Sequence, residues 1–501
     1  MTSSLNIPFD NQYIRIADTL FSEQLPTPVK QPELIRLNQS LAKLLGIDPE
    51  QLRTREGVEV LAGNRIAKGS EPVATVYAGH QFGHWNPQLG DGRAILLGEV
   101  VGTDGLRYDI QLKGAGITPY SRSGDGRSPL GPVLREYIIS EAMAAFGVPT
   151  TRALAAVASN EKVYRDEILP GAVLTRVARS HIRVGTFQFF SARGDTDTIQ
   201  KLADHVIARH YPEIISMENS SANSNVYLRL LQSVISRQAV LMAQWLSLGF
   251  IHGVMNTDNM LVSGETVDYG PCAFMEAYHS GTVFSSIDQQ GRYAYGNQPN
   301  IASWNLAWLG QSLLPLIDSD EKAAIEKIKS ALDQFATQFQ QQYRQRMCAK
   351  IGLIDASDDD VAQLETFLSL MHQHQVDFTL GFRVLSDYLE SDEPTDGSVA
   401  QLYPLPNEFN KWLAQWRERF NLSDVASIES IRQQLNSVNP VFIPRNHRVE
   451  QVISAANKGD FFPFHHLVDL LDDPFTFDPD NASFALPATP EEEVLRTFCG
   501  T

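Results

Sequence analysis

The spacing of hydrophobic residues divides the chain into a strand-rich first part and a helical second part. Between Val73 and Val177, short apolar runs alternate with polar, glycine-rich turns, a pattern typical of antiparallel strands. Further along, apolar residues recur every three or four positions, as on the buried face of a helix. Long helices are therefore predicted over residues 199–211, 226–248, 301–316, 321–351, 359–374 and 408–420.

Three shorter elements complete this outline. Two apolar runs, 94–101 and 108–113, flank a Thr-Asp-Gly turn and predict a hairpin. A helix is predicted from Pro132 to about residue 147, because proline favours the first turn of a helix and a Gly-Val-Pro sequence ends it. Another helix is predicted over residues 33–45, where leucines recur at helical spacing.

The composition is that of a globular protein, with 43% hydrophobic and 20% charged residues. A net charge of −18 argues against nucleic acid or an anionic membrane as the main partner, because the electrostatic force would be repulsive. We expect no leader peptide in residues 1–20, which lack an apolar core, and no membrane span in the longest uncharged run, 238–257. Three cysteines do not make a disulfide framework, so a reducing cytoplasm is the expected compartment.

Several cationic residues are candidate phosphate ligands. Lys113 ends the 108–113 strand on the face opposite its apolar side chains, where it fits either a phosphate or solvent. Arg176, Arg179 and Arg183 follow an apolar strand, and they fit either surface ion pairs or phosphate, which guanidinium groups bind through two hydrogen bonds. Glu136, one turn into its helix, either complements the helix dipole or pairs with Lys113.

The stretch from Gly249 to Pro271 carries the strongest chemical signal. An apolar helix is expected to end at Gly249, and a polar loop then presents Asp258 and Asn259. A short apolar strand and a turn bearing Asp268 follow. Hard oxygen ligands on two adjacent turns are what a magnesium ion bridging nucleotide phosphates requires, so the sequence predicts a site for a nucleotide and its metal.

These residues follow the order found in protein kinases: strand lysine, helix glutamate, asparagine-bearing loop and aspartate turn. In the kinase pattern the catalytic aspartate follows the loop histidine by two positions, and here that position, counted from His252, is Val254. The position of the metal-binding asparagine is Asn259. Asp268 stands where the Asp-Phe-Gly aspartate would. Because valine cannot accept a proton, Asp258 is the nearest carboxylate able to act as the base.

Five longer sequence motifs make the resemblance to a known family specific. They are KGAG at 113–116, TPYSR at 118–122, GDGR at 124–127, HGVMNTDNM at 252–260 and DYGP at 268–271. With them the chain resembles the selenoprotein O family over essentially its whole length. The resemblance implies an α+β, protein-kinase-like fold of two lobes, with a β-rich N-lobe, a helical C-lobe and a helical C-terminal extension.

The resemblance also implies an activity and a domain layout. ATP would bind in a flipped orientation, and AMP rather than phosphate would be transferred to Ser, Thr or Tyr hydroxyls of proteins, with pyrophosphate as the leaving group. The expected divisions are a packing segment at 1–70, an N-lobe at 71–185, a C-lobe core with the catalytic loop at 186–320, and a helical extension with a redox tail at 321–501.

Roles for single residues come from the same resemblance. Lys113, held by Glu136, would contact phosphate, and Arg176 and Arg183 would bind it from the other side. The remaining nucleotide pocket is assigned to Gly90, Gly92, Arg93, Asp125 and Gly126. Asp258 would be the catalytic base, and Asn259 and Asp268 would hold Mg²⁺ or Mn²⁺, with Asp268 also facing the nucleotide.

Three other functions stay open at this point. They are a protein uridylyltransferase using UTP, a kinase that transfers the γ-phosphate with Asp258 as its base, and a pseudokinase scaffold that only binds nucleotide. Loss of activity in Asp268→Ala would separate an enzyme from a scaffold.

The cysteines and two histidines give two further expectations. Relatives with selenocysteine near the C-terminus imply a Cys272–Cys499 disulfide that tethers the tail near the metal site, and two unrelated thiols are the alternative. His80 and His84 have the spacing of helical zinc ligands, but neighbouring glycines disfavour a helix there, so a zinc site is not expected.

Overall fold

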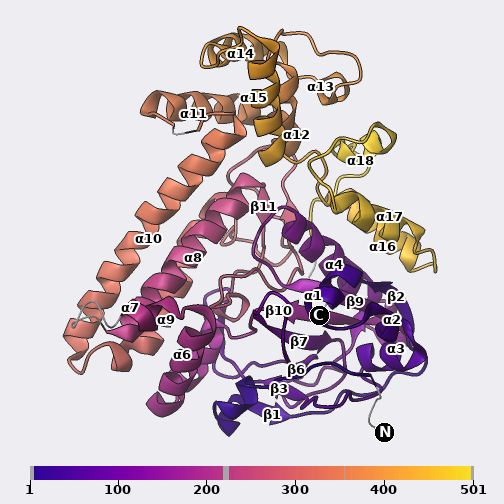
Figure 1. Ribbon diagram of the computed structural model, residues 1–501, viewed down its shortest axis with the longest axis vertical. Coiled ribbons are helices and arrows are strands. Elements are labelled where there is room, and N and C mark those ends of the chain that lie inside the picture. Colours follow the sequence, from indigo (N-terminus) through magenta and orange to yellow (C-terminus); the bar gives the residue numbers. More distant parts are fainter. Residues whose placement is uncertain (1–4, 218–224, 355, 498–501) are drawn as a thin grey trace.

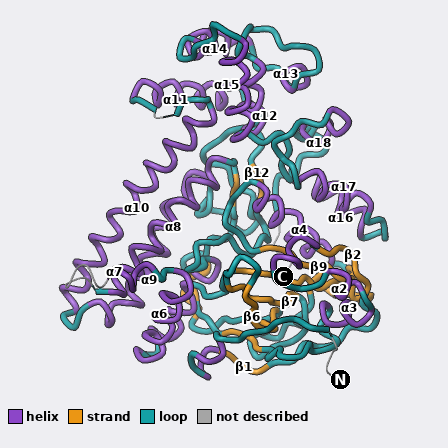
Figure 2. The backbone as a smooth tube through the Cα atoms, viewed as in Figure 1, coloured by secondary structure: helices purple, strands orange, loops and turns teal. Residues whose placement is uncertain are grey.

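The computed structural model describes residues 5–217, 225–354 and 356–497. In these residues an antiparallel sheet forms one end of the molecule and long helices form the other, as Figures 1 and 2 show. The α+β class implied by the sequence is therefore confirmed. None of the described helices combines the length and apolar character needed to cross a membrane.

The sheet has the spatial order β1-β3-β6-β7-β10-β9-β2 among the described strands, and β8 pairs with β10. The strands are β1 Phe21–Glu23, β2 Glu33–Leu37, β3 Val73–Thr75, β6 Ala94–Val101, β7 Arg107–Lys113, β8 Ser128–Pro129, β9 Arg152–Tyr164 and β10 Ile168–Ala178. β6 and β7 form the predicted hairpin, in which Ala94 lies opposite Lys113. The segment 1–70 contributes β1 and β2, one at each edge of the sheet.

Both faces of the sheet are covered by helices. Helices α1 Gln39–Leu44, α2 Pro49–Arg53 and α3 Arg55–Leu61 cover one face, while α4 Leu130–Ala145 lies against β9 and β10 on the other. Ile95 and Leu97 accordingly belong to one apolar core and Leu96 to the other. Because both faces of the sheet are buried, the sequence of β6 is a continuous apolar run and does not alternate between apolar and polar residues.

The helix predicted over residues 33–45 is wrong in its first half. Residues Glu33–Leu37 form strand β2, which pairs with β9 so that Leu37 lies opposite Ala155. Only after Asn38 does the chain turn into α1, whose first turn is capped by the Asn38 side chain. Pairing with a strand more than a hundred residues away overrides the local leucine spacing.

The helical half is built on three long helices, α8 Val226–Ser247, α9 Gln298–Ile317 and α10 Glu321–Lys350, which pack against one another. In Figure 1, α10 leads away from the sheet to the group formed by α11 Asp358–Gln373, α14 Asn410–Arg417 and α15 Val425–Val438. α16 Asn446–Ala456 and α17 Phe462–Leu471 return to pack on α4. The predicted long helices are confirmed, including α6 Thr196–His210, except the one predicted over residues 408–420. There the helix α14 is shorter and follows a 3₁₀ turn at Asn407–Phe409.

The strand predicted directly after Asn259 is wrong. Residues there make only isolated bridges, Arg183 with Leu261 and Thr150 with Thr266. The strands that frame this loop are instead β11 Phe250–Ile251 and β12 Ala273–Phe274. β11 and β12 pair with each other, so the two ends of the loop lie side by side.

Candidate active site

A cleft of about 1070 Å³ lies where the sheet, the glycine-rich loop 114–127 and the loop between β11 and β12 meet. The structure brings every residue predicted for the site to the lining of this cleft. These residues are Gly90, Gly92, Arg93, Lys113, Asp125, Gly126, Glu136, Arg176, Arg183, Asp258, Asn259 and Asp268. The roles of these residues stay predictions, and the contacts of each side chain show which interactions it can make.

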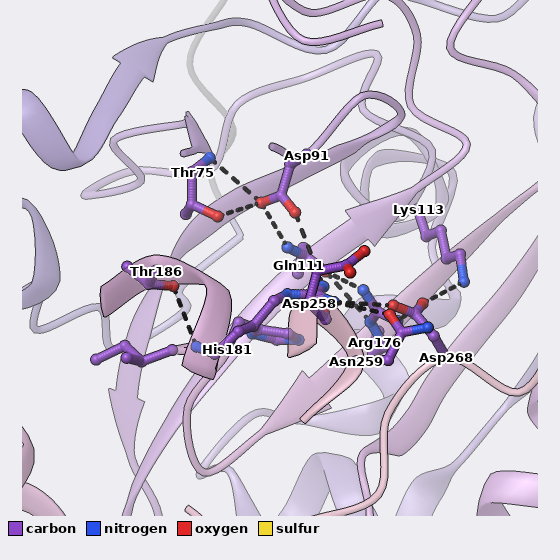
Figure 3. Close-up of polar contacts among 12 residues, drawn as sticks. Thr75, Asp91, Gln111, Lys113, Arg176, His181, Thr186, Asp258, Asn259 and Asp268 are labelled. Atoms are coloured by element: carbon purple, nitrogen blue, oxygen red, sulfur yellow. Dashed lines mark hydrogen bonds and ion pairs between the residues drawn. The ribbon is translucent and has the colours of Figure 1, made fainter. Parts of the chain in front are cut away.

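The Asp268 carboxylate lies among three cationic side chains of the cleft. It lies 2.7 Å from Lys113 Nζ, 2.7 Å from Arg176 Nη1 and 3.0 Å from Arg183 Nη1 (Figure 3). Burial alone would raise the pKa of Asp268, but these three cations outweigh it and hold the pKa well below its usual range. The backbone of Asp268 has φ +64°, an uncommon conformation for a residue other than glycine, which the surrounding contacts hold in place.

Glu136 joins these cations from the other side. Its carboxylate accepts from Lys113 Nζ at 2.6 Å and from Arg176 Nη1 at 3.1 Å. The predicted pair of Lys113 with Glu136 is therefore present, and the dipole interpretation of Glu136 is not needed. Gln111 Oε1 accepts two further hydrogen bonds from Arg176, at 2.7 Å and 3.2 Å.

The arginine trio divides into two different environments. Arg176 and Arg183 are each 2% exposed, so the interpretation as surface ion pairs is wrong for both. Arg179 does not line the cleft, and its backbone N–H donates to Glu265. A cationic cluster this deep requires anions to offset its charge, and Asp268 and Glu136 supply them.

Asp258 lies in the 3₁₀ turn Thr257–Asn259, and its backbone carbonyl accepts a hydrogen bond from Arg183 of this cluster. Its Oδ2 accepts from Gln81 Nε2 at 3.0 Å, while Oδ1 is buried with no hydrogen-bond partner. Burial raises the pKa of Asp258 to about 6, although Arg183 and the Gln81 hydrogen bond act in the opposite direction. A carboxylate with a pKa near the working pH is suited to accept a proton.

The predicted glycines allow two segments of the cleft wall to touch. A Cβ on Gly90 would lie 2.5 Å from the Tyr120 ring, and one on Gly92 would lie 2.8 Å from the Tyr120 carbonyl oxygen. At Gly126 the same atom would lie 2.0 Å from the Gly116 carbonyl oxygen. Asp125, the neighbour of Gly126, forms an ion pair with Arg165 at the rim of the cleft.

We predict that Gly126→Ala destabilises the protein, with Gly105→Ala as its matched control. Both glycines have positive φ, +67° and +77°, but a Cβ on Gly105 would meet no atom within 4 Å. The clash with Gly116 should lower the free energy of unfolding by about 1–3 kcal/mol more in Gly126→Ala. Urea denaturation of both variants measures the difference, and equal losses would show that the loop moves aside freely.

The oxygen donors of the cleft suit a hard divalent cation that arrives with a nucleotide. Among the described residues, no group of three or more His, Cys, Asp or Glu side chains could hold a metal ion. Mg²⁺, however, commonly binds through one or two protein carboxylates together with phosphate oxygens and water. Arg183 Nη1 lies 3.0 Å from Asp268 Oδ2 and 3.5 Å from Asn259 Oδ1, so both oxygens already face one positive charge.

Comparison with known proteins shows to which family this chain belongs. The family model described as protein adenylyltransferase SelO matches residues 3–472. The chain belongs to the SelO family. It is 55% identical over 510 residues to the protein nucleotidyltransferase YdiU of Rhizobium johnstonii, covering 100% of both chains. It is also 55% identical to the YdiU protein of Rhodopseudomonas palustris strain BisB18, covering 99% of this chain and 100% of that one.

Membership of the SelO family confirms the resemblance drawn from the loop motifs, but the cleft contains polar residues that the motifs did not single out. Asp91 is buried, accepts from Thr75 Oγ1 at 2.7 Å and from Gln111 Nε2 at 3.1 Å, and lies 4.0 Å from Arg183 (Figure 3). Gln111 could have been found from the alternation of apolar and polar residues in its strand. This alternation places Gln111 on the same face as Lys113. Gln81 gave no such signal.

In this SelO-family chain the tail returns to the cleft. Thr497 bridges to Ser285, and its Oγ1 donates to the Pro271 carbonyl oxygen at 2.5 Å. The expected return of the tail toward Cys272 is thus present as far as Thr497. Cys499 lies outside the described residues, so the Cys272–Cys499 disulfide stays a prediction. Burial raises the pKa of the Cys272 thiol to about 12.

His80 and His84 lie on two different strands, β4 Gly79–Gln81 and β5 His84–Asn86, and not on a helix. His80 is buried, stacks on Trp308 with ring centroids 4.0 Å apart, and its Nδ1 hydrogen-bonds to Gln188 Nε2. The aromatic contacts account for its burial.

Proposed function

We propose that the chain is a protein adenylyltransferase, which transfers AMP from ATP to Ser, Thr or Tyr hydroxyls of proteins and releases pyrophosphate. The matched family, protein adenylyltransferase SelO, and the protein nucleotidyltransferases similar to this chain support nucleotidyl transfer to protein. The observation that carries the proposal is the meeting of Lys113, Arg176 and Arg183 in one cleft with a buried carboxylate, Asp258. The same proposal includes a kinase-like division into lobes at 71–185 and 186–320.

The cationic cluster would bind the phosphates far from the acceptor. Lys113, Arg176 and Arg183 now neutralise Asp268, and a triphosphate offers them more negative charge in the same place. With the β- and γ-phosphates held there, the α-phosphorus is left to face Asp258. Mg²⁺ or Mn²⁺, for which Asn259 and Asp268 are the ligands on this chain, neutralises phosphate charge when bound.

The reaction then needs one proton acceptor and one stabilised leaving group. The Asp258 carboxylate takes the proton of the acceptor hydroxyl as the hydroxyl oxygen forms a bond to the α-phosphorus. The bond from the α-phosphorus to the bridging oxygen breaks, and pyrophosphate leaves with its charge held by the guanidinium groups. Because these cations are fixed in place before the reaction by Glu136 and Gln111, little reorganisation is needed.

Labelled ATP tests this proposal directly. After incubation with ATP and Mg²⁺ or Mn²⁺, label from the α-phosphate should appear on protein, while label from the γ-phosphate should leave in pyrophosphate. Protein carrying γ-label would identify a kinase instead. Preferential incorporation from α-labelled UTP would identify uridylyl transfer, and no incorporation with either nucleotide would support a binding scaffold.

A further inference from the structure

The turn between β4 and β5 holds an aromatic residue in an unfavourable backbone conformation. Gln81 pairs with His84, so the turn consists of Phe82 and Gly83. Both have positive φ, +51° and +83°, as a type I′ turn requires. Such a turn favours asparagine, aspartate or glycine at its first position, and a bulky residue there is strained. Strain of this kind is concentrated at functional sites, so the place of the Phe82 ring matters.

The contacts of Phe82 place it beside the loop that carries Asp258. Phe82 N–H donates to Asn256 Oδ1 at 3.1 Å, and the Tyr293 hydroxyl donates to the same oxygen at 2.6 Å. The rings of Phe82 and Tyr293 meet edge to face, with centroids 5.2 Å apart. The residue before Phe82, Gln81, donates to Asp258 Oδ2 at 3.0 Å. The strained turn is thus joined on both sides of Phe82 to the loop of the proposed base.

Phe82 lines the cleft together with a second apolar side chain, Ile287, which is 57% exposed. Ile287 precedes Asp288, whose carboxylate accepts from Tyr293 N–H at 2.7 Å. Tyr293 therefore contacts Phe82 through its ring and the segment of Ile287 through its backbone. We call Phe82 and Ile287 the apolar rim. Because both side chains face the cleft and Ile287 is largely exposed to water, a ligand that covers the rim gains free energy from their burial.

We propose that the apolar rim binds an apolar side chain next to the modified hydroxyl of the acceptor protein, which makes Phe82 a specificity-determining residue. This inference rests on the proposed function. The acceptor hydroxyl must come within hydrogen-bond reach of Asp258, so the residues that flank it in the acceptor pass the adjoining Phe82. The rim carries no charge and offers no partner to a phosphate, whereas an apolar side chain leaves water on binding there.

Peptides with a single Ser, Thr or Tyr test the preference. Each is made with leucine or with asparagine, which is polar and of similar size, on both sides of the hydroxyl residue. With the whole chain, ATP labelled at the α-phosphate and Mg²⁺ or Mn²⁺, the wild type should label the leucine peptides with a kcat/KM at least about tenfold higher. Phe82→Ala should remove most of this preference through KM for the peptide, and change KM for ATP less than about twofold.

Two further variants separate the role of the ring from its effect on folding. Phe82→Asn removes the same ring but supplies a residue that the turn favours, so it should melt at a higher temperature than Phe82→Ala. Both should lose the peptide preference equally, whereas a merely structural role would make the loss follow the melting temperature. Phe82→Tyr keeps an aromatic ring and should retain the preference. Phe462→Ala, which removes a 74% exposed ring of α17 outside the cleft lining, is the control and should match the wild type.

The outcomes distinguish this inference from the proposed function. A wild type that labels lysate proteins but labels both peptide sets equally, or neither of them, would overturn the inference and leave the proposed function standing. A preference that survives in Phe82→Ala and Phe82→Asn would overturn it as well. If those variants instead raised KM for ATP alone, the ring would be a platform for the nucleobase. A wild type that puts no α-label on any protein would contradict the proposed function itself.

Discussion

Asp258→Asn is expected to abolish AMP transfer while making the protein more stable at pH 8. Loss of the general base should lower kcat by about 10²–10⁴-fold. The gain in stability follows from burial, because the Asp258 side chain is buried and, among the residues that the structure describes, the side-chain donor to it is the neutral Gln81. An ionised carboxylate in such a site costs free energy that the neutral amide of asparagine does not.

The sign of the pH dependence follows from the raised pKa. The folded protein binds this proton with a pKa of about 6, against about 3.9 for an unfolded aspartate. Protonation is therefore favoured by folding, and the free-energy cost of ionisation grows as the pH rises from the unfolded to the folded pKa and is fully present above pH 6. A difference of about two pKa units corresponds to at most about 3 kcal/mol at pH 8, falling to about half at pH 5 and vanishing below the unfolded pKa.

Urea denaturation at pH 8 and pH 5 measures this effect, with Asp333→Asn as the control on an exposed position of α10. The gain of Asp258→Asn over the control should be larger at pH 8. In activity assays the wild-type kcat should rise through pH 6 as Asp258 ionises. A variant that is less stable than the wild type at pH 8 would contradict the burial argument.

The order of functional residues could be predicted from the sequence because their chemistry depends on short-range spacing. The β6–β7 hairpin places Lys113 at its end, α4 supplies Glu136, and the loop after α8 supplies Asp258 and Asn259 at fixed offsets. Each of these elements is specified by residues within about 20 positions, through turn residues and helical periodicity.

What the sequence did not predict depends on contacts between distant segments. β2 forms because β9 offers a strand edge, and the leucines of residues 33–45 fit either element. Gln81 contacts a residue 177 positions away, and a single half-buried glutamine leaves no periodic pattern. Arg176 and Arg183 are buried while Arg179 lies outside the cleft, a difference that depends on where β10 ends before α5 Val184–Ser191.

Asp268→Asn is expected to abolish AMP transfer and to turn the cleft into a stronger anion site. Lys113, Arg176 and Arg183 all contact this carboxylate, and Glu136 is the other carboxylate in contact with two of them. Removing one charge leaves buried guanidinium groups without compensation, which should lower the free energy of unfolding by about 3–5 kcal/mol. Loss of the metal ligand and of this charge arrangement should lower turnover by at least about 10²-fold.

Pyrophosphate should restore part of this lost stability, because it supplies the negative charge that the variant lacks. In the wild type the anion competes with the Asp268 carboxylate for the same three cations, whereas in Asp268→Asn it does not. Without divalent metal, pyrophosphate should therefore raise the melting temperature of Asp268→Asn more than that of the wild type. Asp469→Asn, which removes a 64% exposed carboxylate paired with Arg36, is the control and should respond like the wild type. If pyrophosphate raised the melting temperatures of all three proteins equally, the cations around Asp268 would not be its binding site. The proposal that these cations bind phosphate would then be wrong.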